Sequence, residues 1–168
     1  KTALDDGRRW VSIRGPQLYS SPDALKPGVL PSYLTWYEIR KPGTEPVRKI
    51  VVADEFSGEQ SFELQLAEPA FYLMAAQSIK DGPPQEVPAN LNNFVAFRIV
   101  NVDSVALPEP TPGKPVFVCM PAEQWHHAEH LAIKDPKSLL MVYAVDEQAS
   151  GTKATTIDQF GLNGMTFG

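Results

Sequence analysis

The chain has 168 residues, 43% of them hydrophobic, 10% aromatic and 21% charged, which is the composition of a globular domain with its own core. Fifteen Lys and Arg stand against twenty Asp and Glu, so the net charge of −5 excludes a basic surface for nucleic acid. The longest apolar run, residues 139–145, is far shorter than the roughly 20 residues of a membrane-spanning helix, so we expect no membrane-spanning segment.

The predicted elements are short β-strands. Sixteen prolines, about twice the usual usage, fall in clusters and leave little room for long helices. Between these clusters lie segments with alternating apolar and polar residues or with many β-branched and aromatic residues, which is typical of strands. In chain order they are residues 9–13, 33–40, 48–54, 61–67, 71–75, 94–100, 116–120, 139–145 and 155–158. Together they predict an all-β sandwich or barrel.

One segment, residues 121–133, has the features of a short helix. Pro121 suits the first helical position, Glu123 lies in the first turn, and no glycine interrupts the segment. We therefore expect a single short helix in an otherwise all-β chain.

The chain repeats itself three times, in units of about 50 residues. Each unit opens with a proline followed by an apolar strand, and a later strand of the unit has an aromatic residue at its centre. The opening prolines are Pro16, Pro69 and Pro115, and the aromatic strands contain Trp36 and Tyr37, Phe97, and Tyr143. We expect units at about residues 5–53, 54–113 and 114–168 that share one core in a single domain, residues 1–168.

Four motifs of the chain resemble those of a known family. Residues 158–161 (DQFG) match a D/N-Q-F-G motif, and residues 54–58 match it with one insertion. Residues 117–122 are similar to an L-C-V-P-S motif, and residues 141–145 to H-x-x-C-Y-x-V. The chain thus resembles an uncharacterised repeat domain of bacterial secreted proteins. This resemblance implies an extracytoplasmic all-β module, secreted or periplasmic, without a known activity.

The single cysteine, Cys119, allows no internal disulfide. In the family pattern two cysteines can pair, whereas this chain has Val142 in the second position and Leu139 in place of the histidine. We therefore expect Cys119 to be an unpaired, buried thiol. A catalytic thiol remains the alternative, and it would need a pKa lowered by a helix N-terminus or a histidine.

All three histidines lie in one pentapeptide, at His126, His127 and His130. In a helix, Glu123, His127 and His130 would share one face, and His126 and His130 would form a second pair. Imidazoles on adjacent turns with a carboxylate can bind copper or zinc, with Glu123 or Met120 as the fourth ligand. The segment does not have the zincin order of residues, and exposed histidines or partner contact are the alternative.

Two tryptophans are candidate contact residues. Trp36 and Tyr37 are neighbours in one strand and face opposite ways, so either one ring leaves the core or both faces of the sheet are covered. An exposed Trp36 or Trp125 could stack on a sugar or anchor a protein partner. The acidic pairs, such as Asp5 with Asp6, fit turns rather than calcium or glycosidase sites.

The pattern as a whole favours a non-catalytic interaction or structural module with protein partners. A subunit of a larger extracytoplasmic assembly is one form of such a module. The chain contains no G-x-S-x-G, P-loop or G-x-G-x-x-G motif, so an enzyme is the less favoured reading. A small copper- or zinc-binding protein is the first alternative and a carbohydrate-binding module the second.

Overall fold

The computed structural model describes residues 1–5, 12–20, 33–40, 47–52, 61–79, 83, 86–102, 114–144, 153–158 and 161–166. All regular structure in this part is β, which confirms the predicted fold class. The strands are β1 (Ser12–Ser20), β2 (Tyr33–Arg40), β3 (Arg48–Val52), β4 (Phe62–Ile79), β5 (Asn93–Val102), β6 (Lys114–Ala122), β7 (Gln124–His126), β8 (Glu129–Leu131), β9 (Leu140–Ala144), β10 (Lys153–Asp158) and β11 (Gly161–Thr166). In these residues no helix is long and apolar enough to cross a membrane.

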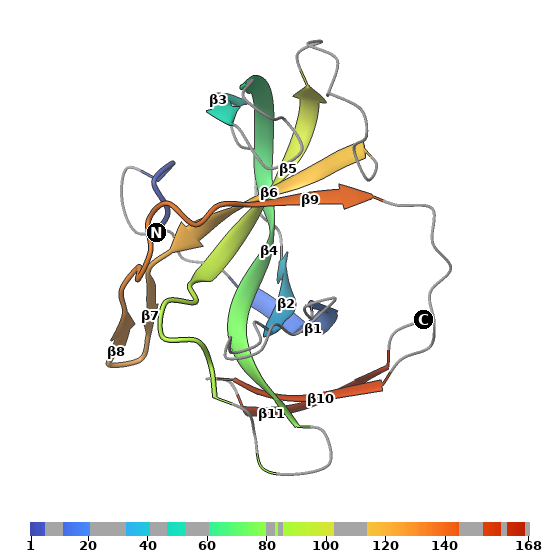
Figure 1. Cartoon of the computed structure of the whole chain (residues 1–168), viewed down its shortest axis with the longest axis vertical. Helices are drawn as coiled ribbons and strands as arrows, with labels where there is room; N and C mark the ends of the chain where they lie inside the picture. Colours follow the sequence, from blue (N-terminus) through green and yellow to red (C-terminus); the bar gives the residue numbers. More distant parts are fainter. Residues whose placement is uncertain are drawn as a thin grey trace.

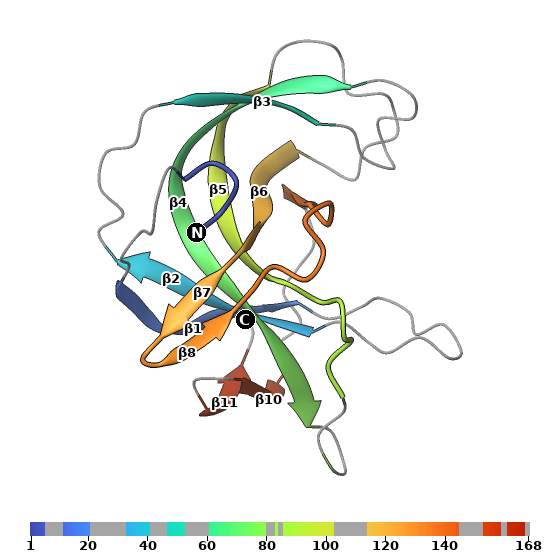
Figure 2. The ribbon, with the colours of Figure 1, turned by 90° about the vertical axis from the view of Figure 1, so that its left-hand side faces the viewer.

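The main sheet is antiparallel, and its central path runs in the order β1-β2-β4-β5-β6-β9 (Figure 1). Strand β3 pairs with the first part of β4, and β10 pairs with its last residues and with β11. Strand β4 has 18 residues and curves through the whole sheet (Figure 2). Register shifts beside Leu66 and Pro69 interrupt its ladder with β5, and such bulges bend a strand. β4 therefore links all the pieces of the sheet.

The three-unit repeat of the sequence is present in the strand register. Within each unit the opening proline lies opposite the aromatic residue of the later strand: Pro16 opposite Tyr37, Pro69 opposite Phe97 and Pro115 opposite Tyr143. A register shift adjoins the proline each time. Proline has no N–H to donate, so it is tolerated where a bulge already interrupts the ladder. This agreement confirms the internal repeat.

Each unit thus supplies two strands. One contains the opening proline and is called here the proline-opened strand (β1, β4, β6), although the proline can lie inside it; the other contains the aromatic residue and is called the aromatic strand (β2, β5, β9). The units lie side by side in the sheet, so each aromatic strand also pairs with the next proline-opened strand. The register of these contacts repeats as well, with Tyr37 opposite Tyr72 and Phe97 opposite Val118. In both contacts the partner is the third residue after the opening proline.

Both faces of the sheet are covered at Trp36 and Tyr37. The two residues are only 6% and 3% exposed, so neither leaves the core. Trp36 belongs to a buried cluster with Leu34, Leu73, Phe94, Ala96 and Cys119. Tyr37 packs in a second cluster with Ile39, Tyr72, Met74 and Ala122. A third cluster, around Leu64, Leu66 and Phe97, also contains Val52, Val118 and Met120. Of the two alternatives left open for this strand, the structure therefore shows the covered one.

The sheet does not close into a barrel in the described residues, and the architecture is an open, sandwich-like packing. β11 pairs with β10, and no ladder joins it to β1 in the part described. Of the sandwich and the barrel expected from the sequence, the described residues therefore favour the sandwich.

The helix expected at residues 121–133 is also wrong. β6 continues to Ala122, and β7 and β8 then form a separate hairpin. Pro121 lies in β6 beyond its last pair with β9, Cys119 opposite Leu140, so β6 there pairs only with β5 among the described strands. A proline is tolerated in such an edge position. The local helix signals were overruled because the strand positions bury Pro121, Ala122 and Gln124.

Candidate functional site: the β7–β8 hairpin

The β7–β8 hairpin follows β6 in the third unit and extends away from the main sheet (Figure 1). It contains every histidine of the chain, together with Trp125. Its ladder places Gln124 opposite Leu131, Trp125 opposite His130 and His126 opposite Glu129. Neighbouring residues of a strand point to opposite faces. The hairpin thus has an outer face with Trp125 and His130 and an inner face with Gln124.

His127 and Ala128 form the turn of the hairpin. His127 has a φ of 53°, the one positive value at a non-glycine residue in the described part of the chain. A side chain with a Cβ in this region costs roughly 1 kcal/mol relative to glycine. The tip therefore holds a strained, exposed histidine.

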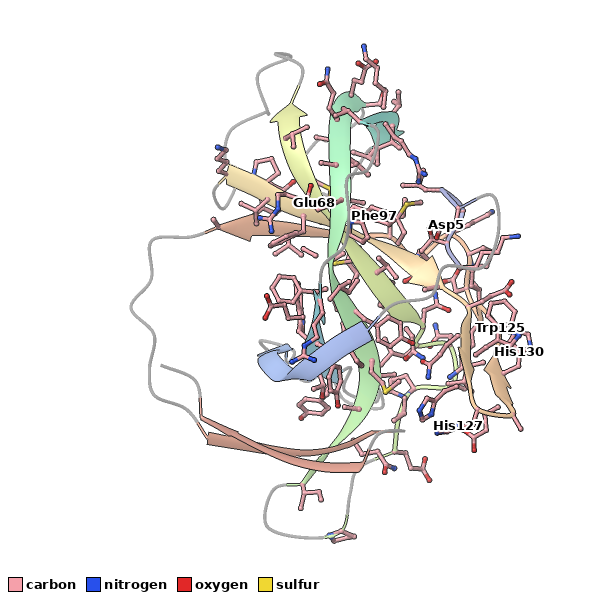
Figure 3. The ribbon with its side chains drawn as sticks, turned by 180° about the vertical axis from the view of Figure 1, so that it is seen from behind. Asp5, Glu68, Phe97, Trp125, His127 and His130 are labelled. Atoms are coloured by element: carbon pink, nitrogen blue, oxygen red, sulfur yellow. The ribbon has the colours of Figure 1, made fainter. Side chains whose placement is uncertain are left out.

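On the outer face, the rings of Trp125 and His130 stack with their centroids 4.6 Å apart and their planes 11° apart. Figure 3 shows Trp125 and His130 next to each other on the hairpin. His130 Nε2 lies 3.5 Å from Glu123 Oε2. The His130 side chain is 47% exposed and that of Glu123 34% exposed. The outer face thus presents an aromatic stack beside a carboxylate to the surroundings.

The inner face is attached to the sheet by buried hydrogen bonds. Gln124 is only 8% exposed, and its Oε1 accepts hydrogen bonds from the Tyr72 hydroxyl and, at 3.1 Å, from Asn93 Nδ2. Asn93 Oδ1 in turn accepts the backbone N–H of Ala75 at 2.9 Å. Buried networks of this kind hold side chains in one arrangement. The base of the hairpin is therefore fixed to β4 and β5.

The segment that returns from the hairpin is fixed by Asn92, which is 2% exposed. Its Oδ1 accepts the backbone N–H groups of Lys134 and Asp135 at 2.8 and 3.1 Å, and its Nδ2 donates to the Asp135 carbonyl. One buried amide thus satisfies three backbone groups of an exposed loop. The sequence contains no periodic signal for Asn92, Asn93, Tyr72 or Gln124, and the Asn pair before β5 is the feature that could have drawn attention to them.

Residues 1–5 support the hairpin from the other side. Backbone atoms of Lys1 and Glu123 exchange two hydrogen bonds, at 2.7 and 2.8 Å. The Asp5 carboxylate accepts the N–H and the hydroxyl of Thr2, each at 2.9 Å. Asp5 therefore has the turn role predicted for it. The other acidic residues considered, including Asp6, Asp54 and Asp146, lie outside the described residues.

The predicted metal ligands do not converge. Because the segment is a hairpin, His126 lies on the face opposite His130, and His127 lies in the turn. His126 and His127 have ring centroids 4.3 Å apart, whereas Glu123 contacts His130. In the described residues, no group of three or more His, Cys, Asp or Glu side chains could hold a metal ion. The arrangement expected from a helix, with Glu123 or Met120 as fourth ligand, is therefore absent from this segment.

Cys119 is buried, as predicted, and unpaired. Its loss of hydration raises the pKa of the thiol to about 12. The catalytic alternative required a helix N-terminus or a histidine to lower this pKa, and β6 supplies neither to Cys119, which lies between Ala96 and Leu140 in the ladders. Cys119 is thus a core residue.

Trp36 does not offer a contact platform. It is 6% exposed, and its ring makes edge-to-face contacts with Phe71 at 5.6 Å and Phe117 at 6.3 Å. The Arg98 guanidinium lies 5.4 Å from the Phe117 ring and forms an ion pair with Glu68 at 2.9 Å. The hypothesis of an exposed Trp36 is therefore wrong, and Trp125 is the remaining candidate of the two.

Comparison with known proteins places the chain in a family. No curated protein and no solved structure matched it. A family model described as a repeat of unknown function matches residues 33–168, which include the second and third sequence units and the hairpin. The chain therefore belongs to this family, the repeat of unknown function DUF7450.

Proposed function

We propose that the chain is a non-catalytic interaction module that binds a protein partner through the outer face of the β7–β8 hairpin. The observation that carries this proposal is the stack of Trp125 on His130, presented by a hairpin whose base is held by Gln124. Tryptophan is enriched among residues that dominate protein interfaces. A preformed stack also loses little conformational entropy when a partner binds.

The position of the hairpin in the repeat supports the same proposal. It occupies the connection between the two strands of the third unit, β6 and β9. In the second unit, the described residues between β4 and β5 contain no strand. Functional segments are commonly added to a rigid scaffold in such connections. The hairpin is therefore a feature of the third unit that the described part of the second unit does not have.

The two alternative functions each required a geometry that differs from the hairpin. A copper or zinc site required convergent imidazoles, and His126 and His130 lie on opposite faces. A sugar platform required an open indole, and the His130 ring already stacks on Trp125. Neither alternative is favoured by a specific observation.

An extracytoplasmic location is part of the proposal, and it is supported by the motif resemblance at residues 117–122 and 158–161. Fractionation of source cells, with detection of the native protein, tests it. The protein is expected in the periplasmic or secreted fraction, and recovery in the cytoplasmic fraction would contradict this location.

The interaction itself is tested with matched variants. The wild-type chain, Trp125→Ala and the surface control Lys137→Ala are used to capture proteins from source-cell fractions, and a captured partner is purified and titrated against all three. We expect Trp125→Ala to weaken binding at least about tenfold, which corresponds to about 1.4 kcal/mol, while Lys137→Ala binds like wild type. A partner that binds all three equally, or no protein enriched by the wild type over Trp125→Ala, would contradict the proposal.

A further inference from the structure

The main sheet ends at β1 on one side and at β9 on the other. Among the strands that the structure describes, β1 pairs only with β2, and β9 only with β6. β11 approaches β1 without forming a ladder with it in these residues. In the described residues, β1 and β9 therefore each have one edge without a ladder.

The repeat specifies which kind of strand belongs at each edge. Inside the sheet, an aromatic strand pairs with the proline-opened strand of the next unit. β2 of the first unit pairs with β4 of the second, and β5 of the second pairs with β6 of the third. β9 is the aromatic strand of the third unit, and among the described strands none pairs with it on the side away from β6. β1 is the proline-opened strand of the first unit. A β9 strand beside a β1 strand would thus be the same combination, an aromatic strand with a proline-opened strand, that pairs inside the sheet.

The register of the two internal contacts is identical. The aromatic residue lies opposite the third residue after the opening proline, as in Tyr37 opposite Tyr72 and Phe97 opposite Val118. In β9 the corresponding aromatic residue is Tyr143. In β1 the third residue after Pro16 is Tyr19.

We propose that β9 of one copy of the chain pairs antiparallel with β1 of a second copy, with Tyr143 opposite Tyr19. The same register places Val142 opposite Ser20 and Ala144 opposite Leu18. This pairing goes beyond the hairpin contact, because it uses the backbone edges of the main sheet and a second copy of the chain as partner.

The composition of β9 supports a covered edge. Exposed edge strands usually carry a charged residue or a proline that prevents pairing with other chains. The five residues of β9, LMVYA, include neither. Leu140 and Val142 are only partly buried while they pack against the core cluster of Trp36. β9 therefore has the character of an interior strand at an edge position.

The pairing would also extend that core cluster. The cluster contains two cross-strand pairs that lie at equivalent positions of the two internal contacts. They are Trp36 opposite Leu73 and Ala96 opposite Cys119. Val142 opposite Ser20 is the third pair of this series. In such a pair, β1 of the first copy and β9 of the second would stay free, so the contact is head-to-tail and produces a ring or a linear assembly.

Mixed cysteine variants test both the partner and the register. Ser20→Cys, Leu18→Cys, Val142→Cys and Ala144→Cys are made singly in a Cys119→Ala background and are mixed in pairs under mild oxidation. The background is needed because Val142 has the position of the second cysteine in the family pattern, next to Cys119 on the paired strand. We expect covalent dimers from the in-register mixtures, Ser20→Cys with Val142→Cys and Leu18→Cys with Ala144→Cys. The two exchanged mixtures are the matched controls, because diagonal neighbours lie about 7–8 Å apart and disulfides need closer Cα atoms.

Each outcome of this experiment decides the proposal. A clear excess of dimer in the in-register mixtures supports it, as does concentration-dependent self-association of the unmodified chain in sedimentation velocity. Equal yields in all mixtures, or dimers of Val142→Cys alone, would overturn it. The double variant Ser20→Cys, Val142→Cys is oxidised at high dilution, and a disulfide-linked monomer would show that the two edges close within one chain, which also overturns it. Circular dichroism confirms that every variant is folded.

Discussion

Tyr72 and Gln124, 52 residues apart in the chain, share a buried hydrogen bond in which the tyrosine hydroxyl donates to Gln124 Oε1. Together with Asn93, which donates to the same oxygen at 3.1 Å, this bond attaches the hairpin to the sheet. The stack of half-buried Trp125 and exposed His130 therefore depends on polar residues that lie in the interior. This dependence couples the stability of the hairpin to that of the sheet.

The first prediction concerns this network. Tyr72→Phe removes one donor to Gln124 and should lower the free energy of unfolding by about 1 kcal/mol. Gln124→Leu should cost more, about 1–3 kcal/mol, because it removes this acceptor from both Tyr72 and Asn93. Urea unfolding measures both changes, and amide hydrogen exchange should show faster exchange in residues 124–131. An exchange rate in the hairpin that is unchanged in Gln124→Leu would show that the network does not hold it.

The second prediction concerns the turn. His127 has a φ of 53°, so His127→Gly should raise the stability of the hairpin by about 1 kcal/mol. Ala128→Gly is the control, because residue 128 has no positive φ and gains no such relief. Hydrogen exchange of the hairpin amides in both variants is the measurement. Slower exchange in Ala128→Gly than in His127→Gly would contradict the strain at position 127.

The third prediction concerns Cys119 and pH. Burial raises the pKa of its thiol from 9.0 to about 12, so the folded state holds this proton more tightly than the unfolded state. The corresponding stability is complete below pH 9.0 and is lost as the pH rises toward about 12. The slope from this group approaches about 1.4 kcal/mol per pH unit. Urea unfolding between these pH values should show a shallower decline for Cys119→Ala than for wild type.

Thiol labelling provides the independent check on Cys119. A disulfide reagent should modify Cys119 of the folded protein only as fast as the protein unfolds. This is slower than the reaction of the same reagent with an exposed thiolate. Rapid labelling at pH 8 without unfolding would mean that the thiol is accessible, and the pH dependence would then need another cause.

The fourth prediction concerns metal. Because His126 and His130 lie on opposite faces of the hairpin, added copper or zinc should leave the melting temperature unchanged. Elemental mass spectrometry of untagged protein and of a His127→Ala, His130→Ala variant checks the same point. Near-stoichiometric metal that disappears in the variant would contradict this prediction and favour the metal-binding alternative over the interaction module.

The repeat could be predicted from the sequence because it consists of prolines and aromatic residues at regular positions, and these residues act on the strand in which they lie. Pro69 and Pro115 interrupt a ladder wherever they lie in a strand, and an aromatic residue such as Phe97 fills the position opposite. Register then follows from the bulge and the alternation of the faces. The burial of Cys119 was expected because the chain lacks the second cysteine and the histidine of the motif it resembles, and the structure confirms it.

The hairpin could not be predicted in the same way. The helix signals at Pro121 and Glu123 are real but weak, and local propensity is overruled when the strand conformation buries more of the segment. The burial of Gln124 depends on Tyr72 and Asn93, which lie on strands distant in the chain. The four proposed metal ligands would lie together only in a helix, and the segment forms a hairpin instead.

The sequence by itself determined the all-β class, the threefold repeat and the buried cysteine, because alternation, proline and aromatic spacing act between neighbours in the chain. Only the tertiary structure decided that residues 124–131 form a hairpin, that Trp36 is buried and that β1 and β9 lie at the edges of the sheet. These features depend on packing and hydrogen bonds between residues far apart in the chain, whose free energies exceed the local preferences of any single segment.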